Sequence, residues 1–178
     1  MIDYVLGDIS SELAKKFGYS KAVKVHVIES KNLKEIKKLA DKPSDLVFVK
    51  GLDEELNRII LASKKIDVLI DCQDSIKKDS FHYRNSGLTQ VSCSIAKKNN
   101  IAIGFSLRSI LKSTNRPLVL GRIKQNIKLC RKYKLKMLFC SLSEDTYDIR
   151  NSQDMLSLAK ILGMNPGEAK KALNLNIR

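Results

Sequence analysis

Short apolar runs rich in β-branched residues alternate along this sequence with segments that place apolar residues three and four positions apart. The runs predict strands, and the spacing of three and four predicts helices. Strands are predicted over 2–6, 22–28, 46–50, 66–71, 101–107 and 136–140. The alternation of the two patterns favours an α/β fold with parallel strands.

The longest predicted helix covers about 116–133 and carries two stripes. The first stripe is apolar and is expected to face the core; it consists of Leu120, Ile123, Ile127 and Cys130. The second stripe is basic and consists of Lys124, Lys128 and Arg131. Capping side chains are predicted at the starts of three other helices; they are Asn32 with Glu35, Asp53, and Asn165 with Glu168.

Residues 1–178 are expected to form a single domain. The alternating pattern fits either a doubly wound sheet or a (β/α) barrel. Complete eight-fold barrels usually need at least about 200 residues, so a barrel of this length would be small or incomplete. In both folds, functional side chains are expected where strands end and the following loops begin.

Acidic residues are missing from one long segment. The chain has 33 Lys and Arg against 19 Asp and Glu, a formal net charge of +14, yet residues 80–143 contain no acid. This acid-free segment holds thirteen basic residues: Arg84, Lys97, Lys98, Arg108, Lys112, Arg116, Arg122, Lys124, Lys128, Arg131, Lys132, Lys134 and Lys136. Such a concentration of positive charge predicts a surface for a polyanion, because each phosphate that it neutralises releases counterions.

The composition disfavours several classes of protein. No apolar run approaches the roughly 18 residues of a membrane helix, and the opening MIDYVLGDIS carries an acid where signal peptides carry positive charge. A cytoplasmic protein without membrane contact is therefore expected. The four cysteines are irregularly spaced and are expected to be reduced and buried. With only two histidines, a metal site of three or more imidazoles is excluded.

A metal-dependent phosphoesterase is an alternative interpretation, because carboxylates follow two of the predicted strands. They are Asp71, Asp74, Glu144, Asp145 and Asp148. One or two carboxylates and water are enough to hold Mg²⁺. Acids in loops are more often caps and turns, which is the favoured interpretation here. A scaffold whose basic surface binds an acidic protein is a second alternative.

Three stretches carry a family resemblance: RNSGL at 84–88, AKKNNIAIGFSLR at 96–108 and DIRNSQDMLSLAKILGM at 148–164. In this order and spacing, and with the opening IDYVLGDI, the chain resembles the archaeal and eukaryotic ribonuclease P protein component 3 family, the thirty-kilodalton subunit family. The resemblance covers essentially the whole chain. It implies a small, incomplete or distorted TIM-like (β/α) barrel, related to the polymerase and histidinol phosphatase fold.

The family serves ribonuclease P, an RNA-based endoribonuclease that removes the 5′ leader of precursor tRNA with Mg²⁺ held by the RNA. The resemblance implies a subunit that is not catalytic by itself and binds no metal or other cofactor. It would bind and activate the RNA with ribonuclease P protein component 2, join other protein subunits, and meet precursor tRNA indirectly. The motif arginines Arg84, Arg108 and Arg150 are the first candidates for RNA contacts. Six further candidates are His82, Lys112, Arg116, Arg122, Lys124 and Lys128.

Overall fold

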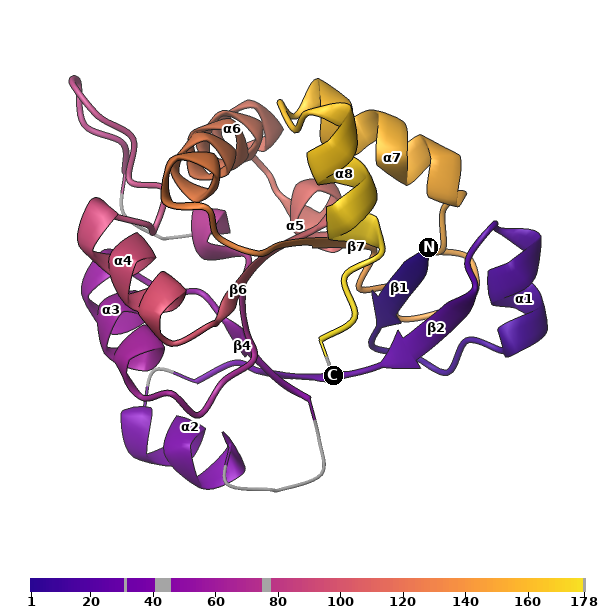
Figure 1. Cartoon of the computed structure of the whole chain (residues 1–178), viewed down its shortest axis with the longest axis horizontal. Coiled ribbons are helices and arrows are strands. Elements are labelled where there is room, and N and C mark those ends of the chain that lie inside the picture. Colours follow the sequence, from indigo (N-terminus) through magenta and orange to yellow (C-terminus); the bar gives the residue numbers. More distant parts are fainter. Residues whose placement is uncertain (31, 41–45, 75–77, 178) are drawn as a thin grey trace.

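The computed structural model of the chain describes residues 1–30, 32–40, 46–74 and 78–177. Its strands are β1 (Ile2–Val5), β2 (Lys21–Lys24), β3 (His26–Ile28), β4 (Val47–Lys50), β5 (Val68–Ile70), β6 (Ala102–Ser106) and β7 (Met137–Cys140). They form a two-stranded sheet, β1-β2, and a five-stranded sheet in the order β3-β4-β5-β6-β7, with every pair parallel (Figure 1). Each predicted strand segment coincides with these strands to within two residues.

The two sheets join into one barrel. Only Val25 separates β2 from β3, and its N–H donates to a β1 carbonyl at 2.8 Å, so this bent strand pairs first with β1 and then with β4. On the opposite side, the Leu142 N–H donates to the Tyr4 carbonyl at 3.1 Å. The Leu6 N–H donates to the Ser143 carbonyl at 2.9 Å. These bonds join the end of β7 to β1 and close the ring. The barrel prediction is confirmed, and the doubly wound alternative is wrong.

Apolar side chains from the ring fill the barrel interior; they are Tyr4, Val25, Phe48, Val68, Ile70, Ala102, Leu138, Cys140 and Leu142. Gly104 on β6 is closely packed, because an added Cβ would lie 3.0 Å from two β5 side chains, which would have to shift. Leu175 and Ile177 of the C-terminal segment pack against the same cluster. The Tyr4 hydroxyl donates to the Leu175 carbonyl at 3.0 Å and accepts the Ile177 N–H at 3.2 Å.

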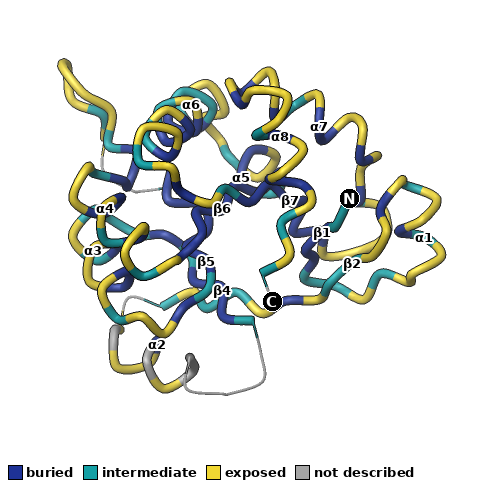
Figure 2. Tube along the Cα trace, in the orientation of Figure 1, coloured by how far each residue is buried: buried dark blue, intermediate teal, exposed yellow. Residues whose placement is uncertain are grey.

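Helices surround the barrel (Figure 1). They are α1 (Ser11–Lys16), α2 (Leu33–Ala40), α3 (Glu54–Ala62), α4 (Gln90–Lys98), α5 (Leu107–Lys112), α6 (Arg116–Tyr133), α7 (Ser152–Ile161) and α8 (Pro166–Leu173), with a 3₁₀ turn, η1 (Cys72–Asp74). Their buried faces and the outer side chains of the strands form a second and larger core, and the exposed residues line the outside (Figure 2). In the described part of the chain, no helix is both long and apolar enough to cross a membrane.

Helix α6 has the bounds and the two stripes that its sequence predicts. Ile123, Ile127 and Cys130 are fully buried, whereas Lys124 and Lys128 are exposed. All four cysteines of the chain are buried and free, as predicted.

Side-chain caps are found at all three of these helices. The Asp53 carboxylate accepts two N–H groups at the start of α3, at 3.1 and 3.0 Å, and Glu168 accepts the N–H of the predicted N-cap of α8 at 2.8 Å. At α2, the Asn32 side-chain oxygen accepts an N–H of the first turn at 3.0 Å, as predicted for a cap. Glu35 does not reach the Asn32 N–H directly, because the Ser30 hydroxyl accepts that N–H at 3.0 Å and donates to Glu35 at 2.6 Å.

Candidate functional site

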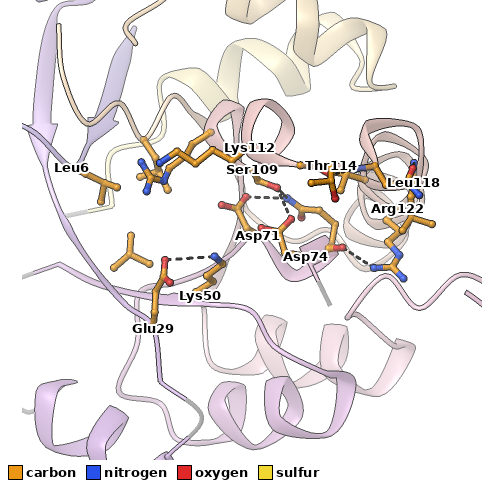
Figure 3. A pocket seen from close by; sticks show the side chains of 17 residues that line it. Leu6, Glu29, Lys50, Asp71, Asp74, Ser109, Lys112, Thr114, Leu118 and Arg122 are labelled. Carbon is orange, nitrogen blue, oxygen red and sulfur yellow. Dashed lines mark hydrogen bonds and ion pairs between the residues drawn. The ribbon is translucent and has the colours of Figure 1, made fainter. Parts of the chain in front are cut away.

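A pocket of ≈ 490 Å³, the mouth pocket, opens at the carboxyl ends of the barrel strands (Figure 3). The ring strands contribute lining residues from their ends or from the positions that follow; these are Leu6, Glu29, Lys50, Asp71, Arg108 and Leu142. The remaining lining comes from η1, from α5 and the loop after it, and from the first turns of α6. This is the end of the barrel at which the sequence predicted functional side chains.

Asp71 forms the buried floor of this mouth pocket and holds β5 to β6. Its Oδ1 accepts the Ser106 N–H at 2.8 Å and the Gln73 side-chain N–H at 2.9 Å. Its Oδ2 accepts the Ser106 hydroxyl at 2.6 Å. Burial, and then the neighbouring Asp74 carboxylate, raises the pKa of Asp71 to about 6. Both carboxylate oxygens are therefore engaged in joining two strands.

Two other carboxylates of the phosphoesterase interpretation, Asp74 and Asp145, also have structural partners. The Ser109 hydroxyl donates to Asp74 Oδ1 at 2.6 Å, and burial raises the pKa of Asp74. Asp145 Oδ1 accepts the Tyr147 N–H at 2.8 Å within a turn. Among the residues that the structure describes, no three His, Cys, Asp or Glu side chains are grouped so that they could hold a metal ion.

Two cations at the rim of the mouth pocket share one carboxylate. Arg108 forms an ion pair with Glu144, and the Lys112 Nζ lies 2.8 Å from the other oxygen of the same carboxylate. Hydrogen bonds from Arg108 and then from Lys112 lower the pKa of Glu144 to about 2. Arg108 Nη1 is buried and has no hydrogen-bond partner among the described residues. Together, Arg108, Lys112 and Glu144 carry one excess positive charge, at a place where an incoming anion meets two cations.

A second hollow of ≈ 490 Å³, the α6 groove, lies on the outside of the barrel, and half of its lining residues are basic. It is lined by Arg84, Lys124, Gln125, Lys128, Arg131, Ile161, Leu162 and Gly163. Arg84 lies against α6, where its Nη1 donates to the Gly121 carbonyl at 3.4 Å, and an added Cβ at Gly121 would come within 3.2 Å of its guanidinium. Arg131 is paired with Glu168 at 2.6 Å. The excess charge of the groove therefore comes from Arg84, Lys124 and Lys128.

Arg122 differs from the other candidates because it is buried. Its side chain is 2% exposed, and Asp79 accepts its Nη2 at 2.7 Å and its Nε at 2.9 Å. Its Nη1 donates to the Gln73 carbonyl at 3.0 Å. The prediction that Arg122 contacts RNA is therefore corrected to an internal role, because its donors are directed at protein acceptors.

The structure separates the remaining candidates. Arg116 is exposed at the start of α6, where its guanidinium donates to the Leu111 carbonyl at 3.2 Å. Arg150 is exposed on the loop before α7 and donates to the Tyr147 carbonyl at 2.8 Å, and it lines neither the mouth pocket nor the α6 groove. His82 lies on an exposed loop beside the groove residue Arg84.

Two basic residues outside the acid-free segment also lie at these surfaces. Lys50 ends β4 inside the mouth pocket, 3.5 Å from Glu29. Its position at the end of a predicted strand identifies it as a candidate, because functional side chains are expected where strands end. Lys78 is exposed next to Asp79 and lies outside the acid-free segment, which begins after that acid. Since Arg122 neutralises Asp79, the basic surface extends to Lys78.

The sequence model of the family described as RNase P subunit p30 matches residues 10–178. The chain belongs to this family. Among p30 family relatives, "Ribonuclease P protein component 3" of Methanosarcina acetivorans is 34% identical over 132 residues, which are 73% of this chain and 52% of that protein. The protein of the same name from Methanothermobacter thermautotrophicus is 26% identical over 159 residues, 88% of this chain and 62% of that protein. The chain thus spans roughly half the length of the first of these relatives.

The fold of this p30 family member is also found in solved structures. A chain of the cryo-EM structure of archaeal ribonuclease P with mature tRNA matches it with a TM-score of 0.74 and 19% sequence identity. The match covers 97% of this chain and 77% of the other. The barrel and its surrounding helices are therefore an architecture found in that assembly.

Proposed function

We propose that this chain is a protein subunit of ribonuclease P and acts by binding the catalytic RNA. Membership of residues 10–178 in the p30 family is the observation that carries the proposal. The names of the relatives and the assembly that contains the structural neighbour support the same role. In this role the chain belongs to a ribonucleoprotein that removes the 5′ leader of precursor tRNA, and it meets that substrate indirectly.

The α6 groove supplies the simplest physical basis for RNA binding. Arg84, Lys124 and Lys128 are exposed around one hollow, in a segment without acids. Each RNA phosphate that they neutralise releases counterions, and the guanidinium group also fixes a phosphate by paired hydrogen bonds. Positive charge held against a folded RNA lowers the cation concentration at which that RNA compacts.

The rim of the mouth pocket offers a second contact for phosphate. Arg108 and Lys112 are held side by side by Glu144, so a phosphate approaching them meets two oriented cations. Glu144 offsets one of these two charges, so we expect this contact to contribute less to binding than Arg84, Lys124 and Lys128 do. Arg116, Arg150 and His82 remain candidates of lower rank, because their surroundings in the chain do not converge on a hollow.

The chemistry of cleavage belongs, in this proposal, to the RNA and its Mg²⁺. Asp71 and Asp145 of this chain are engaged in strand and turn contacts, as described above. Ribonuclease P protein component 2 and further protein subunits are the proposed protein partners. A cytoplasmic location is part of the proposal, and it suits four cysteines that are all free and buried.

The test is 5′ cleavage of precursor tRNA by ribonuclease P RNA at limiting Mg²⁺, with component 2 and with or without this chain. We expect this chain to raise the cleavage rate. A groove variant that removes three charges should lose most of the activation; it combines Arg84→Gln, Lys124→Gln and Lys128→Gln.

The matched control removes three exposed cations from outside the acid-free segment; it combines Lys15→Gln, Lys16→Gln and Lys21→Gln. It has the same net charge as the groove variant and should keep most of the activation. Equal losses in both variants would mean that general charge, and no particular surface, is responsible. No activation by the wild-type chain, folded and bound to component 2, would refute the proposed role.

A further inference from the structure

A hairpin between η1 and α4 projects from the body of the molecule (Figure 1). The turn closed by Ser80 and Tyr83 carries aromatic residues. Phe81 is 100% exposed and Tyr83 is 62% exposed, with His82 exposed between them. The Phe81 and His82 rings meet edge to face, with centroids 5.3 Å apart. Keeping an apolar ring fully exposed to water is unfavourable, because burying its surface would release transfer free energy. The exposed Phe81 ring therefore suggests that a partner covers it.

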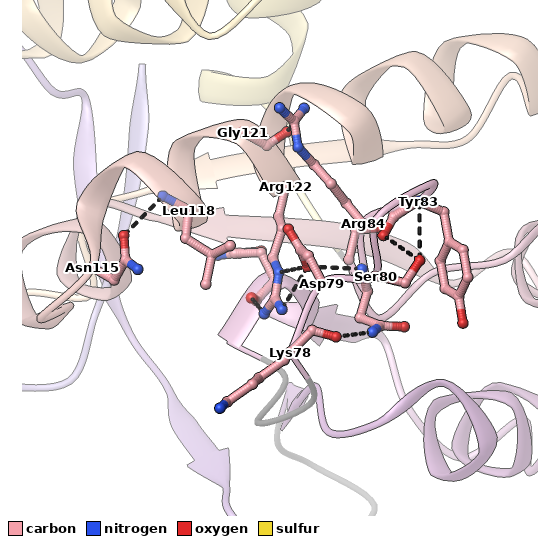
Figure 4. A network of polar contacts seen from close by, with 12 residues as sticks. Lys78, Asp79, Ser80, Tyr83, Arg84, Asn115, Leu118, Gly121 and Arg122 are labelled. Carbon is pink, nitrogen blue, oxygen red and sulfur yellow. Dashed lines mark hydrogen bonds and ion pairs between the residues drawn. The ribbon is translucent and has the colours of Figure 1, made fainter.

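The hairpin is held in shape by polar contacts (Figure 4). The Ser80 N–H donates to the Tyr83 carbonyl at 2.9 Å, and the Ser80 hydroxyl oxygen accepts the Tyr83 N–H at 3.1 Å. At its base, Asp79 accepts the Asn85 N–H at 2.9 Å and the buried Arg122 Nη2 at 2.7 Å. The loop that carries the turn is therefore joined to α6 by the ion pair between Asp79 and Arg122. Little conformational entropy remains to be lost when such a loop binds a partner.

The surroundings of the turn are positively charged. Lys78 and Arg84 are exposed at its two sides, and Arg84 also lines the α6 groove beside Lys124 and Lys128. The acid at the base, Asp79, is neutralised by Arg122. A partner that covers the turn must therefore offer planar apolar faces and negative charge within a short distance of each other.

We propose that Phe81 and Tyr83 stack on unpaired bases of an RNA whose phosphates lie along the α6 groove. The inference rests on the proposed function and specifies which part of the RNA is bound. Unpaired nucleotides combine a flat base with a phosphate, and aromatic side chains stack on them whatever the base. A paired A-form helix does not fit this surface, because its base faces are covered by stacking and only groove edges are open.

The experiment measures binding of a short fluorescein-labelled single-stranded RNA, and of the same sequence as a duplex, over a range of salt concentrations. The variant combines Phe81→Ala and Tyr83→Ala. Losing one stacked base weakens binding about 5- to 150-fold, so we expect this variant, which lacks two rings, to bind the single strand at least about 5-fold more weakly than the wild type does. Duplex binding should change little. The slope of log affinity against log salt concentration should stay as in the wild type, because no charge is removed.

Two control variants separate stacking from other effects. Tyr147→Ala removes an aromatic ring that is 88% exposed on a different loop, and it should bind both RNAs as the wild type does. Lys124→Gln should weaken binding of both RNAs and reduce the salt slope by about 0.7 to 0.9. Thermal melting of each variant should match the wild type, since all three changed rings and the lysine are exposed.

The possible results distinguish this inference from the proposed function. If the wild type binds neither RNA, the proposed function fails. If the wild type binds and the Phe81 and Tyr83 variant binds equally well, the stacking inference is overturned and the proposed function stands. Equal weakening on single strand and duplex would also overturn it. So would unchanged RNA binding together with lost binding of component 2, which would make the hairpin a protein contact.

Discussion

The ion pair between Arg122 and Asp79 links the hairpin to helix α6, and removing its acid should destabilise the whole domain. Asp79→Ala deletes the carboxylate and leaves the guanidinium buried, with its side chain 2% exposed. Breaking a buried pair by removing one partner costs about 3 to 5 kcal/mol, because the charge that stays in the interior loses the carboxylate that offset its desolvation. The Asp79 side chain is 19% exposed, so water can replace part of the lost contact. We therefore expect a loss of about 3 kcal/mol, at the lower end of that range.

The assay is thermal and urea unfolding followed by circular dichroism. For a chain of this size, about 3 kcal/mol corresponds to a fall in melting temperature of about 6 to 12 °C. The matched control is Asp8→Ala, which breaks the exposed pair with Lys24, whose side chains are 87% and 45% exposed. That control should cost less than about 1 kcal/mol.

A double variant tests the cause. Asp79→Ala combined with Arg122→Met removes both charges and should recover much of the stability lost by Asp79→Ala alone, because neither charge of the pair then has to be desolvated. The reasoning would be refuted if Asp79→Ala cost no more than Asp8→Ala. It would also be refuted if the double variant were less stable than Asp79→Ala.

Three further outcomes are expected. Burial raises the pKa of both Asp3 and Asp71 from 3.8 to about 6, so the folded state holds these protons more tightly than the unfolded state does. The protonated carboxyl groups contribute about 3 kcal/mol each to the free energy of unfolding; this contribution is complete below pH 4 and is lost as the pH rises to about 6. In urea titrations, Asp3→Asn should remove about half of this pH dependence. Gly87→Ala should lower the melting temperature clearly, because φ is +77° and the added Cβ would lie 2.1 Å from the Cys72 carbonyl oxygen; a melting temperature within 1 °C or so of the wild type would contradict this. Tyr4→Phe removes the hydroxyl that holds the C-terminal segment in the barrel and should cost about 1 to 3 kcal/mol, with hydrogen exchange accelerated at residues 175–177 and unchanged exchange there counting against it.

The elements of this protein are encoded locally and could be predicted from the sequence. Strand segments are recognisable because apolar β-branched residues follow one another, and helix α6 is recognisable because its apolar and basic stripes repeat with the helical period. The position of Arg108 just beyond the end of β6 also follows from local pattern. These features depend on neighbours within a few residues.

Other features depend on residues that are far apart in the sequence, and only the tertiary structure decided them. Closure of the barrel brings Asp3 against Ser141, 138 residues away, and no periodicity distinguishes this ring from an open sheet. Charge counting treated Arg122 and Lys124 alike. The folded chain buries the first against Asp79, 43 residues away, and leaves the second in water. Whether a cation is available to a partner is set by the acids that folding brings next to it, because Coulomb attraction depends on distance in space.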